Sequence, residues 1–155
     1  MPTKVKRLAV DQMDRKLPTL QRAAAVLKQA APRSGWLKTI RSALDMGASA
    51  LGRKLGIAHS SALELEQNEV SGSITLASLR KAADALDADL VYAIVPRKKL
   101  RDTISARARE VAREQIMPIA KSMALEQQGI SQAQIKRQIA ELAQELEEKP
   151  RELWR

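Results

Sequence analysis

The most informative part of this sequence is residues 51–66, LGRKLGIAHSSALELE. Apolar residues recur at helical spacing on both sides of Gly56 and predict two short helices. Gly56 tolerates a left-handed backbone and so permits a tight turn between them. Gly52 is small enough to let the two helices cross closely. Together these features predict a helix-turn-helix motif.

Further helices are expected on both sides of this motif, so residues 35–87 would form one small helical unit. Apolar residues from Trp36 to Leu44 predict a helix that closes near Met46-Gly47. Ser49 is a candidate N-cap for the next helix, expected at 50–55, and the third is expected at about 58–67. Thr75 would cap a fourth helix that ends near residue 86.

Several residues of the expected third helix are left over once its apolar positions are assigned to the core: His59, Ser60, Ser61, Leu63 and Glu64. A helix presented in this way can enter the major groove of DNA. His59 would donate to guanine or phosphate, or else be an ordinary solvent-facing or capping residue. Ser60 and Ser61 suit phosphate or water-mediated contacts. Glu64 would accept from cytosine, or simply be a surface acid that phosphate repels.

Contacts with the DNA backbone are expected from Ser49, Arg53, Lys54 and Lys38, although the three basic residues could equally be ordinary surface charges. Direct readout is sparse, because no Arg, Asn or Gln lies on the exposed face of the third helix before Gln67. Choice of sequence would then depend partly on DNA shape.

The net charge of +9 is unevenly distributed and points to a polyanionic partner. Residues 1–34 carry a net charge of +6 and residues 88–101 a net charge of +3, whereas the other parts of the chain are neutral. The excess lies in an N-terminal arm and in a basic run at 97–101. Beside a helix-turn-helix, these groups favour phosphate contact; alone, they could be solvated faces.

Three regions are expected: a basic helical arm (1–34), the helix-turn-helix domain with a trailing strand (35–96), and a helical C-terminal region (97–155). In the arm, Pro18 should end or kink the first helix near residue 17. The run Leu90–Val95 is rich in β-branched residues and predicts one short strand, which needs a partner. Two or three helices are expected after Lys99, at about 100–116, 118–128 and 131–148, with Pro118 at a helix start.

Dimerisation is expected because one recognition helix reads only a few base pairs. The predicted strand could pair with its copy in a second subunit or with the N-terminal region. The apolar stripe Ile135, Ile139, Leu142 and Leu146 is the alternative interface.

Other classes of protein are disfavoured by composition. The chain has no Cys and one His, which leaves no thiolate or zinc site and no nucleophile–base set, so we expect no enzyme activity, metal or cofactor. No apolar stretch approaches the ~20 residues of a membrane-spanning helix. The N-terminus lacks the apolar core of a signal peptide, and a soluble cytoplasmic protein is expected.

The segment 36–87 resembles the XRE/Cro-like family of phage-repressor DNA-binding domains, and LGRKLGIAHSSALELE is similar to its helix 2–turn–helix 3. The resemblance implies a mainly α, lambda-repressor-like domain. It also implies an ion pair that locks the fold, between Arg41 on the first helix and Glu66 at the end of the third; otherwise these are two solvated charges. The sequence departs from the family at Ala48, where a phosphate-contacting Gln is common.

Nearly the whole chain resembles a narrower bacterial family, mobile mystery protein A. The similar parts include SGSITLASLRKAADALD, DLVYAIVPR and the near-terminal PRELW. That resemblance implies an antitoxin-like regulator encoded beside a Fic-domain protein of the mobile mystery protein B type. Inhibitors of Fic proteins present a helix reading Ser/Thr-x-x-x-Glu-Gly/Asn. Ser122 and Glu126 match this pattern, Gln127 does not, and an ordinary helix surface is the alternative.

The competing interpretation is a protein-interaction module that inhibits its partner without specific DNA binding, which the zero net charge of residues 35–87 permits. A membrane-surface role for the basic arm is disfavoured because its apolar face lacks Trp and Phe. Salt dependence distinguishes DNA binding from a protein-interaction module, since binding to DNA weakens steeply as salt rises whereas an apolar protein contact does not.

Overall fold

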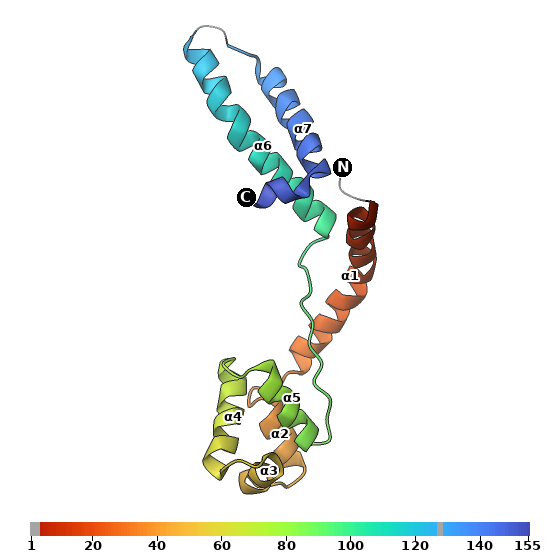
Figure 1. Ribbon diagram of the computed structural model, residues 1–155, viewed down its shortest axis with the longest axis vertical. Helices are drawn as coiled ribbons and strands as arrows, with labels where there is room; N and C mark the ends of the chain where they lie inside the picture. Colours follow the sequence, from red (N-terminus) through yellow and green to blue (C-terminus); the bar gives the residue numbers. More distant parts are fainter. Residues whose placement is uncertain (1–3, 127–128) are drawn as a thin grey trace. The chain divides into compact units, whose positions relative to one another are not determined.

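The computed structural model describes residues 4–126 and 129–155, and within them the chain is mainly helical, as expected. The helices are α1 (Lys4–Ala30), α2 (Trp36–Ala43), α3 (Ala48–Leu55), α4 (His59–Ser71), α5 (Leu76–Ala85), α6 (Leu100–Leu125), α7 (Gln132–Glu148) and the 3₁₀ helix η1 (Pro150–Trp154) (Figure 1).

Two compact units divide the chain. One is built from residues 23–94, and the other combines the N-terminal residues up to Arg22 with 95–155. Helix α1 contributes to both, because its first part belongs with the C-terminal helices and its last turns with α2–α5. This division differs from the expected three regions, in which 1–34 formed a separate arm.

The unit 23–94 is organised around a small aliphatic core. Leu37 of α2, Leu51 of α3, and Ala82 and Leu86 at α5 are all at least 95% buried. Half-buried apolar residues, including Ile40 and Leu55, surround them. Helices α2–α5 gather around this core in Figure 1. Since the chain has no Phe, packing depends on short aliphatic side chains, which suit closely spaced short helices.

Each of the four helices in this core ends in the same way. A left-handed residue follows the last turn: Asp45 after α2, Gly56 after α3, Gly72 after α4 and Asp87 after α5. After α3, the N–H of Ile57 donates to Gly52 O (2.9 Å) and the N–H of Gly56 to Arg53 O (3.3 Å). These are the two bonds of a Schellman motif, which satisfies carbonyls that have no partner inside the helix.

The helix starts only partly follow the sequence-based expectations. Thr75 is confirmed as a cap, because its hydroxyl accepts from the N–H of Ser78 (3.1 Å) at the start of α5. The prediction that Ser49 caps the second helix is wrong. Helix α3 begins at Ala48 and its N-cap is Gly47, which supplies no side-chain bond. Burial of Ala48 draws it into the helix and leaves Ser49 on the surface.

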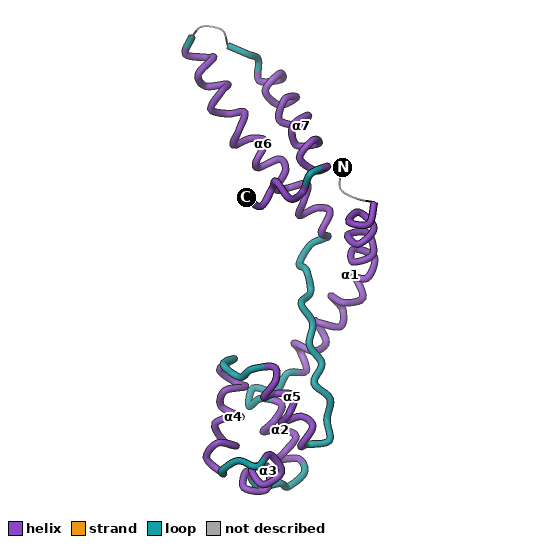
Figure 2. The backbone as a smooth tube through the Cα atoms, in the orientation of Figure 1, coloured by secondary structure: helices purple, strands orange, loops and turns teal. Residues whose placement is uncertain are grey.

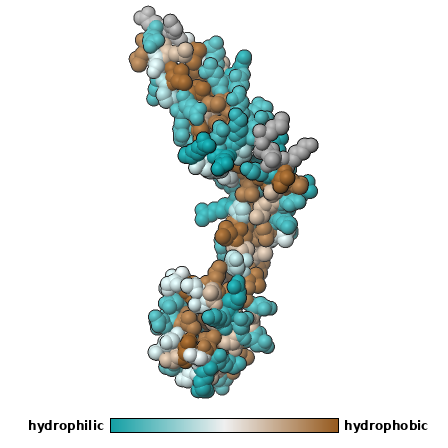
Figure 3. Space-filling model, in the orientation of Figure 1, coloured by the Kyte–Doolittle hydropathy of each residue, from teal (hydrophilic) through white to brown (hydrophobic). Residues whose placement is uncertain are grey.

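The C-terminal helices α6 and α7 lie side by side and form a helical hairpin (Figure 1). Fully buried Ala108 and Ala112 on α6 let α7 approach closely, and Ala143 and Leu146 of α7 pack against them. The predicted stripe on α7 is thus used inside the chain, with Ile139 and Leu142 beside this core. Figure 3 shows apolar side chains at the surface of the hairpin, where Ile119 and Leu125 are exposed.

The carboxylates of Asp11 and Asp14 tie helix α1 to the start of α6. Asp14 accepts from the N–H of Leu100 (2.6 Å) and from the N–H of Arg101 (3.2 Å). Gln21 donates its side-chain amide to the carbonyls of Pro96 and Arg97. The first turn of a helix has unpaired N–H groups and a positive dipole, so Asp14 stabilises α6 from a distant part of the sequence.

Two prolines lie inside helices: Pro18, where the sequence predicted an end or a kink, and Pro118, where it predicted a helix start. Helix α1 does not end at Pro18, and α6 continues through Pro118, so the separate helices expected at 100–116 and 118–128 are one. A proline removes one backbone bond and strains the preceding turn. Burial of the neighbouring Leu17 and Ala120, which are 3% and 6% exposed, offsets that cost.

The strand predicted at Leu90–Val95 is also wrong: among residues 4–126 and 129–155 no strand is present. The segment between α5 and α6 is drawn as a loop throughout Figure 2. Its β-branched side chains favour extended backbone, but a strand exists only when a neighbour pairs with it. No helix in the described part of the chain is long and apolar enough to cross a membrane.

Candidate nucleic-acid interface

The connection between α3 and α4 is only three residues long, and its geometry fixes how α4 leaves the core. Gly56 adopts φ 68° and ψ 30°, a left-handed conformation that costs other residues about 1–2 kcal/mol. A Cβ on Gly52 would lie 2.8 Å from Ile57 O, so only glycine lets the turn fold back against α3. Both glycines identified in the sequence are therefore required by the backbone.

One side of α4 is buried and the other is open. Ala62 and Glu66 are at most 4% exposed, whereas His59, Ser60, Glu64 and Gln67 are exposed. Residues three, four and seven apart share a helix face, so Ser60, Glu64 and Gln67 form one polar surface. Of the other expected contact residues on α4, Leu63 is exposed and Ser61 is half-buried.

Ser49 and His59 meet across the turn. The hydroxyl of Ser49 lies 3.0 Å from Nδ1 of His59, within hydrogen-bond distance. This bond joins the first turn of α3 to the first turn of α4 and leaves Nε2 of His59 as the imidazole's second hydrogen-bonding atom. Two residues that the sequence suggested separately for DNA contact thus form one polar group.

The expected backbone-contacting cations are on the surface. Arg53 and Lys54 lie in the last turn of α3, and Lys38 lies in α2; all three are exposed. None of the ion pairs between described residues includes them. Their charges are therefore not used by carboxylates in the described part of the chain and remain accessible to an anionic partner.

Arg41 and Glu66 form the ion pair that the resemblance implied. Glu66 Oε1 lies 2.5 Å from Nε of Arg41, and Oε2 accepts from Nη2 at 3.1 Å. The remaining Nη1 donates to the carbonyl of Met46 (2.7 Å), in the turn between α2 and α3. A guanidinium that makes several aligned bonds holds its partners at fixed angles. The pair therefore ties α4 to α2 and to the loop before α3.

The hydrogen bond that Arg41 donates to Glu66 is the main cause that raises the pKa of Arg41, with burial acting in the opposite direction. A raised pKa means that this charge contributes stability below the unfolded pKa and loses it only as pH rises through the folded value. Because an arginine guanidinium stays protonated at any ordinary pH, the contribution of Arg41 is constant over that range.

Glu69 is a structural residue that sequence reasoning missed. Its carboxylate accepts from the N–H of Trp36 (2.7 Å) and from the N–H of Leu37 (2.9 Å), and so caps α2. A Cβ on Gly35 would lie 2.8 Å from Glu69 Oε2. The Gly-Trp junction before α2 was the only local signal of this arrangement, because the cap comes from 33 residues further along the chain.

The residues proposed to act on a Fic partner lie at the end of α6. Ser122 and Glu126 are both exposed, and the N–H of Glu126 donates to Ser122 O (3.3 Å), which places the residues one turn apart. Gln127, the third position of that pattern, lies outside the described residues. The two side chains thus share one face of the last turn.

No protein-family model, curated protein or solved structure matches this chain. Its function has therefore to be inferred from the geometry and chemistry of its own residues. Gln67 is an additional candidate for contact with a partner. The sequence predicted a helix that ends at Gln67, whereas α4 continues to Ser71. Gln67 therefore lies inside the helix and on its polar face.

Proposed function

We propose that residues 23–94 are a lambda-repressor-like helix-turn-helix domain and that the protein is a transcriptional regulator that binds specific double-stranded DNA. One observation carries the proposal: the Gly56 turn presents the polar face of α4 to solvent, while Glu66 on its opposite face is fixed by Arg41. A helix held rigidly by one side and polar on the other is suited to the major groove.

In this proposal the exposed polar face of α4 reads base edges. Gln67 can bond adenine at two atoms, Glu64 can accept from cytosine, and Nε2 of His59 can bond a base or a phosphate. Ser60 and Ser61 are too short for most base edges and serve phosphate or water-mediated contacts. The side-chain amide of Gln67 can make this two-atom contact from inside α4, whereas the sequence alone predicted Gln67 at the end of the helix.

The DNA backbone is contacted from α3 and α2. Ser49 lies in the first turn of α3, whereas Arg53 and Lys54 lie in its last turn and Lys38 comes from α2. These contacts set the register of the protein on the duplex and release counterions, but they carry no sequence information. The sequence preference would then come from α4 and from the shape of the DNA.

The test is selection of duplexes from a random pool by the full chain, followed by fluorescence anisotropy with the enriched duplex and a scrambled one. We expect at least ~100-fold preference for the enriched sequence at physiological salt. Gln67→Ala should weaken specific binding by about 1–3 kcal/mol and relax the preference at one position. Lys136→Ala, an exposed change on α7, is the matched control. Failure to enrich any sequence contradicts the proposal.

We also propose a homodimer that forms through the segment 89–95. Its backbone groups form no hydrogen bond with another described residue, and Val91, Tyr92 and Ile94 are 60–89% exposed. Two copies of this segment can pair in antiparallel fashion about a two-fold axis, which also suits a palindromic DNA site. The stripe on α7 is a weaker candidate because α6 covers it.

Light scattering checks the dimer. The wild type should have twice the mass of one chain, and Val91→Lys combined with Ile94→Lys should be monomeric, because paired charges oppose strand association. Leu125→Lys, at another exposed apolar position, is the control. A wild type that is monomeric at high protein concentration rules out this interface.

A second candidate function concerns the end of α6, where Ser122 and Glu126 are exposed on one face. The resemblance to mobile mystery protein A suggests inhibition of a Fic-domain protein of the mobile mystery protein B type, as an antitoxin and autorepressor. Glu126→Gly should restore AMP transfer by that partner while leaving DNA binding intact. A variant that still silences the partner ends the idea. Inhibition with no salt-sensitive DNA binding would favour the interaction-module alternative.

A further inference from the structure

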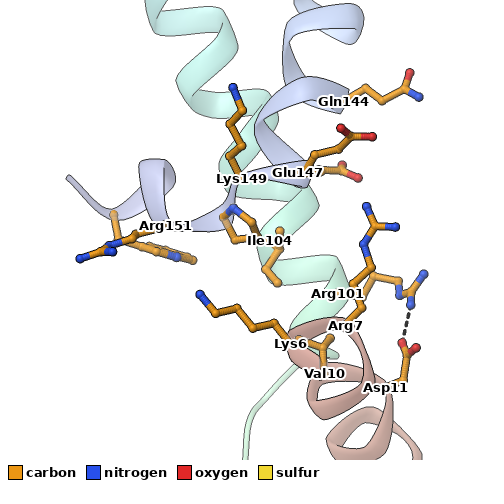
Figure 4. Close-up of a pocket in the computed structure, with 13 residues that line it drawn as sticks. Lys6, Arg7, Val10, Asp11, Arg101, Ile104, Gln144, Glu147, Lys149 and Arg151 are labelled. Atoms are coloured by element: carbon orange, nitrogen blue, oxygen red, sulfur yellow. Dashed lines mark hydrogen bonds and ion pairs between the residues drawn. The ribbon is translucent and has the colours of Figure 1, made fainter. Parts of the chain in front are cut away.

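A cavity of about 760 Å³ lies in the unit that combines the first part of α1 with α6, α7 and η1. This volume falls in the range of about 300–1,000 Å³ that is typical of ligand pockets. Figure 4 shows the three helices converging there, with Val10 of α1 and Ile104 of α6 between the charged side chains. All residues that line the cavity belong to this unit, whereas the surface proposed to bind DNA belongs to residues 23–94.

One side of the cavity combines positive charge with an aromatic ring. Figure 4 shows Lys6 and Arg151 on this side, whereas Lys149, which also lines the cavity, extends away from both. Trp154, whose side chain is 60% exposed, also lines the cavity. Arg151 and Trp154 are three residues apart in η1, and side chains at that spacing eclipse in a 3₁₀ helix. A cation and an indole ring are therefore presented together.

The aromatic side is held in place. Leu153 is 1% exposed in the core of this unit, and its carbonyl accepts from Nε of Arg107 on α6 (3.1 Å). Trp154 is thus attached to a fixed turn, although its own ring is largely open to solvent. A ligand that packs on this ring meets a surface that needs little ordering, which favours binding.

The other side of the cavity can accept hydrogen bonds. Gln144 and Glu147 of α7 line it and lie together in Figure 4, opposite Lys6 and Arg151. The ion pair between Arg101 and Asp11 closes the same side. No ion pair among the described residues uses Glu147, Lys6, Lys149 or Arg151. Charges of both signs are therefore available to one ligand.

We propose that this cavity binds a small aromatic anion of the nucleoside monophosphate class. The phosphate lies between Lys6 and Arg151, and the base packs against Trp154. The sugar hydroxyls donate to Glu147 and Gln144, which accept such bonds.

Simpler ligands use only part of the cavity. A free inorganic anion leaves the ring of Trp154 unused and meets repulsion from Glu147. An uncharged nucleoside leaves Lys6 and Arg151 unpaired. A fatty acid would place its chain beside carboxylates and an amide, which lose water without gaining partners. A ligand with an anionic end, a flat ring and hydroxyl groups matches all parts of the cavity at once.

The test titrates the full chain with AMP, GMP, CMP and UMP in turn, and with inorganic phosphate and the corresponding nucleosides as comparison probes. In a Trp36→Phe protein, Trp154 is the only tryptophan, so its fluorescence reports directly on the cavity. We expect saturable quenching by at least one monophosphate, and binding at least ~10-fold tighter than that of phosphate or the nucleoside. The test does not involve DNA, so its outcome is independent of the function proposed above.

Variants assign the site by calorimetry. Trp154→Ala should raise Kd about tenfold or more, as loss of a base–aromatic stack does, whereas Trp154→Phe keeps most of the affinity. Lys6→Gln with Arg151→Gln, both exposed changes, should weaken the monophosphate but not the nucleoside. Lys136→Gln on α7 is the control. No saturable binding of any monophosphate, equal affinity for inorganic phosphate, or an equal loss in Lys136→Gln overturns the proposal.

Discussion

Glu66 and Arg41 are joined at two pairs of atoms, and Glu66 is the one charged residue among the described residues that the fold buries almost completely. Breaking a buried pair leaves an uncompensated charge in a poor solvent. We therefore predict that Glu66→Gln lowers the free energy of unfolding by about 3–5 kcal/mol. Urea denaturation of the wild type and of the variant measures this change in the free energy of unfolding.

Glu64→Gln is the matched control for that experiment, because Glu64 is exposed on the same helix. Its unfolding free energy should stay within about 0.5 kcal/mol of the wild type. If both variants behave alike, the pair does not hold α4 to α2.

Gly56→Ala is predicted to destabilise the unit 23–94 by about 1–2 kcal/mol, because alanine disfavours the left-handed conformation at this position. Specific DNA binding should weaken as well, since the start of α4 would move. Gly129→Ala provides the comparison: a Cβ at this position would have no neighbouring atom within 4 Å, and the φ of Gly129 is not left-handed. Thermal melts that rank the two variants in the opposite order contradict the role of Gly56.

Asp14→Ala should destabilise the unit that contains α6 by about 1 kcal/mol, since the cap of α6 loses its two acceptors. Amide hydrogen exchange at Leu100 and Arg101 should accelerate, because both N–H groups lose their partner. Glu145→Gln, an exposed change on α7, should leave the exchange rates unaltered. Unchanged protection in Asp14→Ala would show that the carboxylate does not cap the helix in solution.

Gly47→Ser is predicted to stabilise the protein by a few tenths of a kcal/mol up to about 1 kcal/mol. Gly47 is the N-cap of α3, has φ −69° and ψ 153°, and has free space around it. A serine there can accept from a backbone N–H of the first turn, which glycine cannot. Differential scanning calorimetry should show a higher Tm, and a lower one would mean that the turn before α3 differs from the structure.

Arg53→Gln is predicted to weaken DNA binding about equally on enriched and scrambled duplexes. If Arg53 contacts one phosphate, the slope of log K against log salt should become about 0.9 less steep. Arg137→Gln, on α7 and paired with Glu141, should leave the slope unchanged. A loss confined to the enriched duplex would instead place Arg53 at a base edge.

Local chemistry could be predicted well from the sequence, whereas long-range contacts could not. Gly56 and Thr75 act through neighbours a few residues away, so composition and spacing were enough to identify them. The caps from Glu69 to α2 and from Asp14 to α6 join residues 32 to 87 positions apart and leave no local pattern. They become visible only when the helices are placed in space.

The errors have a common physical cause, which is that tertiary context outweighs local preference. Pro18 and Pro118 both disfavour the preceding helical turn, yet the helices continue because buried neighbours stabilise them. The run 90–95 has the composition of a strand but no partner in the described part of the chain. In the binding face, Ser49 was expected to cap a helix and instead bonds His59.

The first part of helix α1 belongs to the same unit as residues 95–155, and residues 23–94, which lie between them in the sequence, form the other unit. This chain order has a consequence for proteolysis. A single nick after Tyr92, in the exposed loop, would give two polypeptides. The first fragment would still supply Asp14 and Gln21 to the start of α6. The halves would therefore migrate together in native buffer and separate only in denaturant, so that proteolysis alone would not free the DNA-binding unit from the rest.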